Sequence, residues 1–336
     1  MTLISCLPSN CWYAITPSAN LNSSPLSIPF AGKQFVLFRT TLGSLACFSD
    51  VCSHRGASLS LGTVEDGCLR CPFHGWKFDS AGTCIEVPAD GPGTSLPARS
   101  HLREEQIVHE HQGFIWLWFG DQPSNLDLLP DLPSFSPDDW QYVTSSFVWD
   151  THFSRVIESN LDNSHAYWVH KGTFATQDSP LSIPYDLDRN EKSVSAKVKF
   201  DLPLPRVLKI LQRLQGKKPG LSAVTKFSYF YPNINIVDTK VGDFLHVIFV
   251  NASLPQAEDK TISRWIKFSP RKRFNMPGRE KKSIEISRSI FTEDHDVVKS
   301  QRPFATPLEF YSESHVGSDI LSIEFRKMLK DHVAKQ

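Results

Sequence analysis

The 336-residue sequence lacks a net charge, because 36 Lys and Arg residues balance 36 Asp and Glu residues. It contains no apolar run near the roughly 20 residues that a membrane-spanning helix needs. Its start, MTLISCLPSNCWYAI, lacks the basic segment and the small-residue cleavage site of a secretory signal. Internal repeats and low-complexity segments are missing as well. These absences argue against a nucleic-acid partner, an anionic membrane surface and a membrane span, so we expect a cytoplasmic protein.

The length suits two domains at roughly 150 residues each. Short runs rich in β-branched and aromatic residues fill residues 1–120 and predict an all-β domain. Residues 121–140 are rich in Pro and Asp, which predicts a linker. Residues 141–336 mix strand-like runs with helical patterns, which predicts an antiparallel sheet that carries helices. The expected fold class is therefore α+β.

The local patterns predict individual elements of these domains. A basic run from Arg271 to Lys282 lies in a Pro- and Gly-containing stretch and predicts a solvated loop. The expected strands are 33–40, 44–49, 68–73, 76–79, 113–120, 194–202, 224–237, 243–254 and 261–268. The expected helices are 153–170 and a C-terminal one with Leu321, Phe325, Met328 and Leu329 on one face.

Cysteine is present in an odd number, seven residues, and several lie next to histidine. This pattern favours a reducing compartment and a metal site over a disulfide framework. Cys52-x-His54 and Cys71-x-x-His74 are separated by 16 residues that can form a hairpin and bring the two pairs face to face. Two thiolates and two imidazoles suit a tetrahedral zinc ion, and they equally suit a Rieske [2Fe–2S] cluster. The remaining cysteines of this region are expected to be small buried hydrophobic residues: Cys47, Cys68 and Cys84.

A second candidate site lies in VIESNLDNSHAYWVHKGTF. Asp162 and His165 are three residues apart and share one face of a helix. His170 is five residues further on, about 140° around a straight helix. The two histidines can therefore bind one ion only if the helix bends or ends between them.

These motifs resemble a known family. The boxes SHRG and CPFHGW resemble the cluster-binding boxes of Rieske proteins of the ring-hydroxylating type. The pattern Asp-x-x-His-x-x-x-x-His that follows resembles the mononuclear iron site of Rieske non-heme iron oxygenases. The chain is most similar to the monooxygenase branch without a β-subunit, with its cyanobacterial saxitoxin-pathway hydroxylases, pheophorbide-oxygenase-like hydroxylases and aromatic O-demethylases. The resemblance implies a Rieske domain followed by a helix-grip, START-like catalytic domain.

The resemblance also implies roles for individual residues. His165 and His170 become ligands of a mononuclear Fe(II), and Asp162 becomes the bridge to His74 of a neighbouring subunit. The third iron ligand is a carboxylate seven residues before a Gln, which selects Asp294 ahead of Gln301. Among the other candidates, Asp296 ranks second, and Glu293 and His295 are expected at the surface. The cluster ligands are Cys52, His54, Cys71 and His74.

The position three residues before the bridging carboxylate departs from the family pattern. Relatives often have Asn there, whereas this chain has Ser159 followed by Asn160. Either residue can take the polar role beside Asp162. The residues that could line a substrate pocket, or else form ordinary sheet packing, are Phe227, Tyr229, His246 and Asn251, with Trp168 and Trp265 similarly ambiguous.

The resemblance implies an oxygenase. Electrons from NAD(P)H pass through a separate ferredoxin or flavin reductase, and O₂ is used to hydroxylate or oxidatively demethylate a small aromatic, tetrapyrrole or alkaloid substrate. A head-to-tail contact between subunits must close into a ring, and the resemblance implies that this ring is a homotrimer. The alternatives are a Rieske electron-transfer or binding protein without oxygenase activity, a dihydroxylating dioxygenase and a structural zinc protein.

Overall fold

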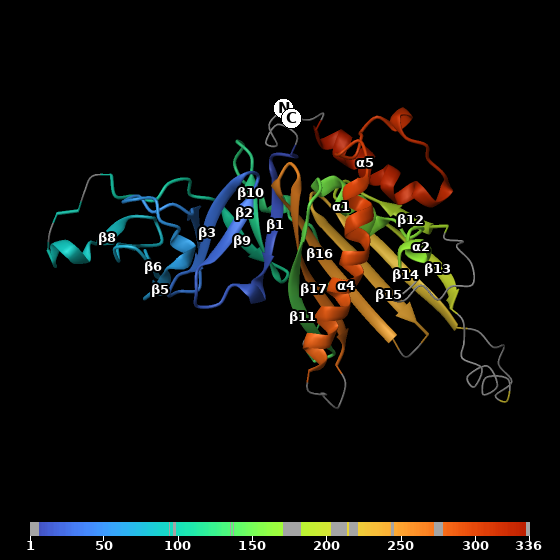
Figure 1. Cartoon of the computed structure of the whole chain (residues 1–336), viewed down its shortest axis with the longest axis horizontal. Coiled ribbons are helices and arrows are strands. Elements are labelled where there is room, and N and C mark those ends of the chain that lie inside the picture. The colour runs from blue at the N-terminus through green and yellow to red at the C-terminus, as the bar shows by residue number, and fades with distance from the viewer. Residues whose placement is uncertain are drawn as a thin grey trace. The chain divides into compact units, whose positions relative to one another are not determined.

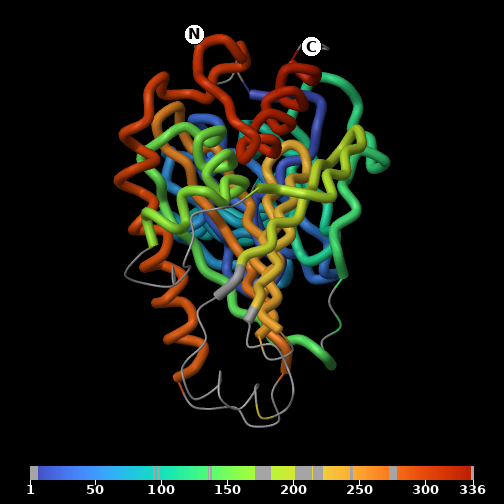
Figure 2. Tube along the Cα trace, turned by 90° about the vertical axis from the view of Figure 1, so that its right-hand side faces the viewer, coloured from blue at the N-terminus to red at the C-terminus, as the bar shows by residue number. Residues whose placement is uncertain are grey.

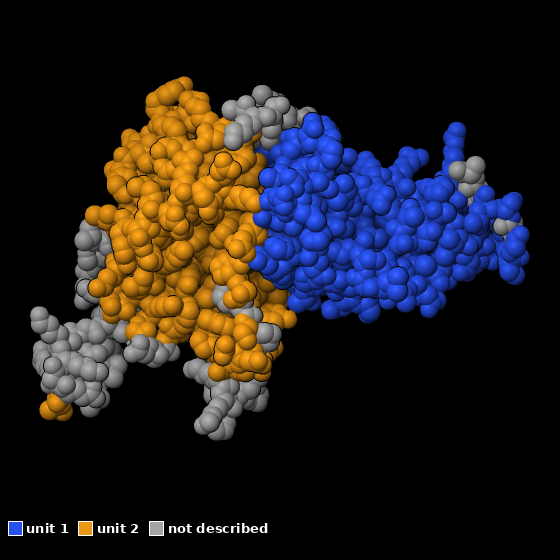
Figure 3. All heavy atoms as spheres, turned by 180° about the vertical axis from the view of Figure 1, so that it is seen from behind, with its two compact units in different colours: residues 1–129, 254–258 blue, residues 130–253, 259–336 orange. Residues whose placement is uncertain are grey.

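The structure is a computed structural model of the chain, and it describes residues 7–93, 95–96, 99–134, 136, 138–170, 183–202, 214, 221–242, 245–271 and 278–333. The chain forms two compact units, coloured separately in Figure 3. Unit 1 comprises residues 1–129 and 254–258, and unit 2 comprises residues 130–253 and 259–336. The division at Leu129 falls inside the segment 121–140 for which the sequence predicts a linker. The predicted domain bounds themselves stay a prediction.

Unit 1 is built from small antiparallel sheets, which confirms the all-β prediction. Two of its tryptophans, Trp12 and Trp116, are fully buried. The sheets are β1 (Cys11–Pro17), β10 (Phe114–Phe119) and β9 (Val108–His111); β2 (Leu26–Phe30), β3 (Lys33–Arg39) and β4 (Leu45–Ser49); and β5 (Thr63–Glu65), β6 (Cys68–Arg70), β7 (Lys77–Phe78) and β8 (Cys84–Glu86).

Two loops of unit 1 carry the Cys and His motifs. The first connects β4 to β5, and the second is the tight connection between β6 and β7. Cys52 and Cys71 belong to the same hydrophobic cluster as Leu69, Trp76 and Phe78. The small four-stranded sheet and its core therefore hold both loops in place.

Unit 2 contains one seven-stranded sheet in the order β11-β17-β16-β15-β14-β13-β12. Successive side chains of each strand point to opposite faces of the sheet. Residues that are paired in register on neighbouring strands therefore lie on the same face. The strands are β11 (Trp140–Trp149), β12 (Tyr185–Arg189), β13 (Ser193–Leu202), β14 (Leu221–Phe230), β15 (Ile234–Val241), β16 (Leu245–Ala257) and β17 (Lys260–Pro270).

Helices cover one face of this sheet. Figure 1 shows α4 in front of the strands, and the turned view of Figure 2 shows it (orange) running along their side. Phe291 and Val298 of α4 pack with Trp149 and Trp265 of the sheet and Val156 of α1. The helices are α1 (Phe153–Leu161), α2 (Ala166–Val169), α4 (Arg279–Ser300) and α5 (Ile320–Val333). None of the helices in the described ranges is long and apolar enough to cross a membrane.

Several element predictions are confirmed and others are wrong. The expected strands are present, although 68–73 ends at Arg70 and 76–79 is shortened to Lys77–Phe78. The expected strand 224–237 is instead a hairpin of β14 and β15 that turns at Tyr231. The apolar stripe of α5 is buried as predicted. The expected helix 153–170 is broken after Leu161, and the second helix is a single turn. The expected loop 271–282 is wrong from Arg279 on, where α4 begins; residues 272–277 lie outside the described residues.

Candidate metal centres

The two Cys and His loops of unit 1 have the same backbone geometry. In the first, Cys52 N donates to Ala57 O and Gly56 N donates to Cys52 O, both at 2.9 Å. In the second, Cys71 N donates to Trp76 O at 2.9 Å and Gly75 N donates to Cys71 O at 3.1 Å. Gly56 and Gly75 both have φ of +74°, which glycine adopts at low cost. The chain thus presents two equivalent turns, each with one Cys and one His.

The side chains of these loops converge. The ring centroids of His54 and His74 are 4.6 Å apart, and His54 stacks on Trp76 with centroids 4.4 Å apart and an angle of 5° between the planes. Nδ1 of His54 is buried and has no hydrogen-bond partner among the described residues. A buried nitrogen without a partner costs free energy unless it meets a ligand. Phe73, beside His74, is 64% exposed.

The thiols also suit a metal group. Cys52 and Cys71 are both buried. Burial, followed by the neighbouring thiol of Cys71, raises the pKa of Cys52 to about 11. Such a thiol stays protonated at neutral pH unless a cation stabilises the thiolate. An iron–sulfur cluster supplies that charge.

The geometry favours a cluster over a single zinc ion. Four ligands of one zinc ion, each at about 2.0–2.3 Å, would place their ligand atoms close together. Among the described residues, ligand atoms of three side chains come within 4.8 Å of one another at a site in unit 2. Cys52, His54, Cys71 and His74 do not form such a group. A two-iron cluster separates the cysteine pair from the histidine pair. The residues therefore fit a Rieske cluster, for which we assign Cys52, His54, Cys71 and His74 as a proposal.

The neighbouring cysteines Cys47, Cys68 and Cys84 differ in how deeply they are buried. Cys47 and Cys84 are buried, as the sequence predicts. Cys68 is only partly buried at the start of β6, so its prediction as a buried residue is wrong. It lies at the tip of a hairpin, where the turn at Asp66 and Gly67 leaves one side open to solvent.

The second site is in unit 2, where α1 ends. Asp162 is the C-cap of α1 and has an extended backbone, with φ of −80° and ψ of 128°. His165 and His170 then flank the single turn of α2, as its N-cap and C-cap. Ending one helix and starting another brings the two rings together, with centroids 5.4 Å apart. This break removes the 140° mismatch of a straight helix.

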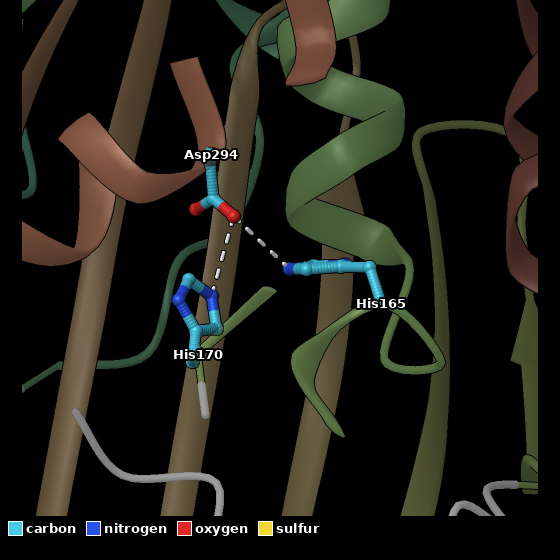
Figure 4. Close-up of side chains that lie close together, drawn as sticks. All are labelled: His165, His170 and Asp294. Carbon is cyan, nitrogen blue, oxygen red and sulfur yellow. Dashed lines mark ion pairs between the residues drawn. The ribbon is translucent and has the colours of Figure 1, made fainter. Parts of the chain in front are cut away.

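Asp294 of α4 completes the group (Figure 4). Its Oδ1 lies 3.4 Å from Nε2 of His165 and 3.2 Å from Nε2 of His170. The ligand atoms of all three residues lie within 4.8 Å of one another. Two histidines and one carboxylate on one side of an ion form the facial triad of non-heme Fe(II) oxygenases, which leaves positions for O₂ and substrate. The residues fit a mononuclear iron, and we assign them to it as a proposal.

Each histidine has a carboxylate behind it. Nδ1 of His165 lies 3.3 Å from Oδ2 of Asp162, and Nδ1 of His170 lies 2.7 Å from Oε2 of Glu293. A carboxylate that accepts from Nδ1–H leaves the lone pair of Nε2 free for a metal. Burial alone would raise the pKa of Asp162, but the hydrogen bond and charge of His165 and the hydrogen bonds of Ser164 outweigh it and lower the pKa. This carboxylate is therefore ionised and able to orient the ring.

Glu293 is the residue beside the three candidate ligands for which the sequence predicts no contact with them. It was expected at the surface, yet it contacts the buried His170. The other two candidates lie apart from the group: Asp296 is exposed and pairs with Lys299 at 2.9 Å, and His295 accepts from the backbone N of Asp150 at 3.1 Å. The adjacent pair Glu-Asp in the sequence is the signal that could have pointed to Glu293.

Ser159 and Asn160, the two candidates for the polar role beside Asp162, have different surroundings. A cavity of about 320 Å³ opens beside the site, and its lining includes Ser159, Asp162, His165 and Asp294. Asn160 instead donates from Nδ2 to Val156 O of its own helix at 2.8 Å. Ser159 thus lines the same cavity as Asp162, whereas the amide nitrogen of Asn160 bonds within its own helix.

Buried ion pairs fix the helix that carries Asp162. Glu158 of α1 accepts from Arg155 at 3.0 Å and from Nε of Arg326 in α5 at 2.7 Å. Glu313 accepts from both arginines. Removing one partner of such a buried pair costs about 3–5 kcal/mol, so this network ties α1 firmly to α5.

Most residues considered for a substrate pocket have ordinary structural partners. His246 bonds to Asp238 Oδ1 at 2.7 Å across two strands, and the hydroxyl of Tyr229 donates to Pro232 O at 2.8 Å. Nδ2 of Asn251 donates to Ser253 Oγ at 3.3 Å, and its Oδ1 is buried without a partner in the described residues. Phe227 is buried in the sheet.

Comparison with protein families gives two matches. Residues 11–102 match the Rieske [2Fe-2S] domain, and residues 149–335 match the vanillate O-demethylase oxygenase C-terminal domain. The second match covers more than half of the chain. The two candidate sites fall one in each matched segment.

Individual proteins are similar along parts or all of the chain. The putative toluene-4-sulfonate monooxygenase system iron-sulfur subunit of Comamonas testosteroni is 32% identical over 186 residues, 55% of this chain and 52% of that protein. The chain thus spans about half of that relative's length. The methylxanthine N1-demethylase of Pseudomonas putida is 28% identical over 318 residues, 91% of this chain and 82% of that protein. The structure of dicamba monooxygenase bound to dicamba is similar to this chain with a TM-score of 0.75 and 20% identity. The match covers 100% of this chain and 99% of the dicamba monooxygenase chain, which shows a shared fold.

Proposed function

The chain belongs to the family of Rieske oxygenases whose C-terminal domain is that of vanillate O-demethylase oxygenase, and on this basis we propose that it is a Rieske non-heme iron monooxygenase. Its reaction takes O₂, two electrons and two protons, inserts one oxygen atom into a C–H bond of a small organic substrate and releases the other as water. If the carbon belongs to an O- or N-methyl group, the hydroxylated product loses formaldehyde, and the net reaction is demethylation. The observation that carries the proposal is the convergence of His165, His170 and Asp294.

Two cofactors are held by different parts of the chain in this proposal. Cys52, His54, Cys71 and His74 would hold the cluster, and His165, His170 and Asp294 would hold Fe(II). When bound, the cluster supplies single electrons, and the ferrous ion supplies a site where O₂ can be reduced beside the substrate.

The residues of unit 2 prepare this site. Asp162 and Glu293 hold the Nδ1 protons of the two histidines, so that both Nε2 lone pairs face Asp294. Asp294 and His170 are buried, whereas the partly buried His165 lines the cavity beside the site. Preorganised ligands of this kind need no rearrangement when the metal binds.

A monooxygenase of this kind needs a partner that supplies electrons and neighbouring subunits that connect the cluster to the iron. A separate ferredoxin or flavin reductase supplies electrons from NAD(P)H, since the chain contains no nicotinamide-binding fingerprint. Asp162 lines an open cavity, where His74 of the partner subunit in a head-to-tail homotrimer would donate a hydrogen bond to it. The exposed Phe73 beside His74 suits burial in such a contact. A cytoplasmic location is part of the proposal.

The substrate class remains broad at this stage. By their names, the similar proteins act on toluene-4-sulfonate, a methylxanthine and dicamba. We propose a small aromatic, tetrapyrrole or alkaloid compound for this chain. The rival proposals are an electron-transfer or binding protein without oxygenase activity and a dihydroxylating dioxygenase.

The proposal is tested by incubating a metabolite pool with the iron-loaded protein, a reductase, NADH and ¹⁸O₂, followed by mass spectrometry. A monooxygenase gives a product with one ¹⁸O atom, or a demethylated product and labelled formaldehyde. Two ¹⁸O atoms in one product would identify a dioxygenase. Reduction of the cluster without any labelled product would support the electron-transfer alternative.

A further inference from the structure

The second cluster loop of unit 1 has an exposed tip. Pro72, Phe73 and His74 are exposed, whereas Trp76 at the end of the loop is buried. In the first loop, the ring of His54 stacks on this buried Trp76. His74 instead contacts the exposed Phe73, with ring centroids 4.0 Å apart. Packing on the core therefore restrains His74 less than it restrains His54.

Arg70 of β6 bridges this second loop by a hydrogen bond. It directly precedes Cys71, and its Nη1 donates to the carbonyl O of Gly75 at 2.6 Å. Gly75 directly follows His74, and its backbone N donates to Cys71 O at 3.1 Å. One guanidinium group thus joins the strand before the first proposed ligand of the loop to the residue after the second.

Two carboxylates hold the guanidinium group in place. Nε of Arg70 donates to Oε2 of Glu65 on β5 at 2.7 Å. Nη1 and Nη2 donate to Oε1 and Oε2 of Glu86 on β8, at 3.3 Å and 3.1 Å. An isolated surface ion pair contributes little, but a two-pronged pair within a network keeps its geometry. The Arg70 side chain is therefore a fixed connection between three strands and the loop.

The two cluster loops differ in this connection although they share the same backbone turn. The residue before Cys52 in the first loop is Val51, which is exposed and cannot donate a hydrogen bond from its side chain. Gly75 also lies closely against its neighbours, since a Cβ there would be 3.2 Å from Cγ of Pro88 and 3.7 Å from Nη1 of Arg70. The arginine thus belongs to the loop whose histidine has the weaker packing.

We infer that Arg70 is a positioning residue of the proposed cluster. It fixes the loop that carries Cys71 and His74, and its charge offsets Glu65 and Glu86 beside that loop. Reduction adds one negative charge to a cluster, so a nearby cation raises the reduction potential and nearby carboxylates lower it. This inference rests on the proposed function, because it concerns the cluster assigned there.

The first test measures the reduction potential of the cluster by anaerobic dithionite titration with redox dyes, followed by visible absorption. Arg70→Met leaves Glu65 and Glu86 uncompensated, so the equilibrium constant for one-electron reduction should fall about 3- to 10-fold. Glu86→Gln removes a negative charge and keeps an oxygen that can accept from Arg70, so this constant should rise. A residue that only stabilised the fold would not give shifts of opposite sign.

The second test measures how firmly the loop is held, as the rate at which a chelator removes the cluster. Arg70→Met should lose the cluster at least about tenfold faster than the wild type. Arg70→Lys keeps the charge but not the two-pronged pair. Its equilibrium constant for reduction should stay within about twofold of the wild type, while its rate of cluster loss lies between those of wild type and Arg70→Met.

Arg39 offers a matched control in the same unit. It pairs with both carboxylate oxygens of Glu110 at 2.8 Å, and its Nη1 donates to Gly43 O at 3.2 Å, in a hairpin without proposed ligands. Arg39→Met should leave the potential and the rate of cluster loss unchanged. Circular dichroism and the thermal midpoint show whether Arg70→Met is folded; if it is not, Arg70→Lys and Glu86→Gln carry the comparison.

Three outcomes would overturn the inference. These are unchanged potentials in both Arg70→Met and Glu86→Gln, equal rates of cluster loss in wild type and Arg70→Met, and shifts of the same size in Arg39→Met. A wild-type protein without iron and without cluster absorption would contradict the proposed function itself. The wild type alone therefore distinguishes a failure of the proposed function from a failure of the role of Arg70.

Discussion

Nδ1 of His170 lies 2.7 Å from Oε2 of Glu293, and Nε2 of the same ring lies 3.2 Å from Oδ1 of the adjacent residue, Asp294. Two consecutive residues of α4 therefore contact the two nitrogens of one imidazole. Although burial opposes it, the carboxylates of Asp294 and Glu293 raise the pKa of His170. In the proposed iron site, Glu293 keeps the proton on Nδ1, and Asp294 joins Nε2 at the metal.

Glu293→Ala should lower the affinity for Fe(II) by roughly 10- to 100-fold, the usual effect of losing a residue that orients a metal-bound histidine. Glu293→Gln should lose less, because its amide oxygen can still accept from Nδ1–H. The affinity is measured by competition with a chelator. Glu285→Gln, at an exposed position of the same helix, is the control. An unchanged affinity of Glu293→Ala would remove Glu293 from the site.

The cluster motif and Asp294 could be predicted from the sequence because their signals are local. Each loop places Cys and His within four residues of each other, so one turn determines their relation. The choice of Asp294 comes from the resemblance to the family, through its spacing of seven residues to Gln301. Asp296 could be set aside only with the structure, where it is exposed.

The sequence did not predict helix α4, so the contact of Glu293 with His170 was not predicted either. Its buried stripe is Ser287, Phe291, Asp294 and Val298, of which half are polar, so hydrophobic periodicity does not reveal it. Trp168 was read as core or pocket, yet it is 61% exposed, because α2 is a single turn and has no second turn to cover it. Tertiary contacts, not local pattern, decide both cases.

With Fe(II) supplied in excess, so that both metal centres are filled, Asp162→Asn should lower coupled turnover by roughly 10- to 100-fold. The asparagine oxygen can still accept from Ser164, which bonds to Oδ1 at 2.7 Å, but an NH₂ group then faces Nδ1 of His165. The acceptor that orients this ring is lost. Iron content, cluster absorption and the rate of electron transfer from a pre-reduced cluster are measured, with Asp296→Asn as the control. Full electron-transfer rates in Asp162→Asn would show that this carboxylate has no bridging role.

His54→Ala should abolish the visible absorption and the reduced-state electron paramagnetic resonance signal of the cluster, because one iron loses a ligand. Cys68→Ser should retain both, since Cys68 is a partly exposed residue of β6 and not a proposed ligand. Metal analysis gives a second measurement, with iron expected in the wild type and in Cys68→Ser. Zinc in place of iron in a colourless wild-type protein would contradict the cluster assignment.

The stability of unit 2 should fall in acid because of His152, the N-cap of α1. Its Nδ1 accepts from Ser154 N at 3.3 Å and lies 2.7 Å from Ser154 Oγ, which requires the neutral ring. Burial, helped by the charge of Arg155, lowers the pKa of His152 from 6.5 to about 4. The unfolded chain therefore takes up this proton first as the pH falls. The contribution to the free energy of unfolding is complete above pH 6.5 and is lost towards pH 4, about 3 kcal/mol in all.

His152→Asn isolates this effect, because asparagine is a good N-cap that does not titrate. Urea unfolding of the metal-free proteins at pH 7 and pH 4.5 gives the free energies. Between these values the wild type should lose about 2 kcal/mol more than His152→Asn, since most of the interval between the two pKa values has then been crossed. A constant cost of the smaller side chain cancels in this comparison. Parallel losses in the two proteins would mean that His152 is already protonated in the folded state, and that another group responds to acid.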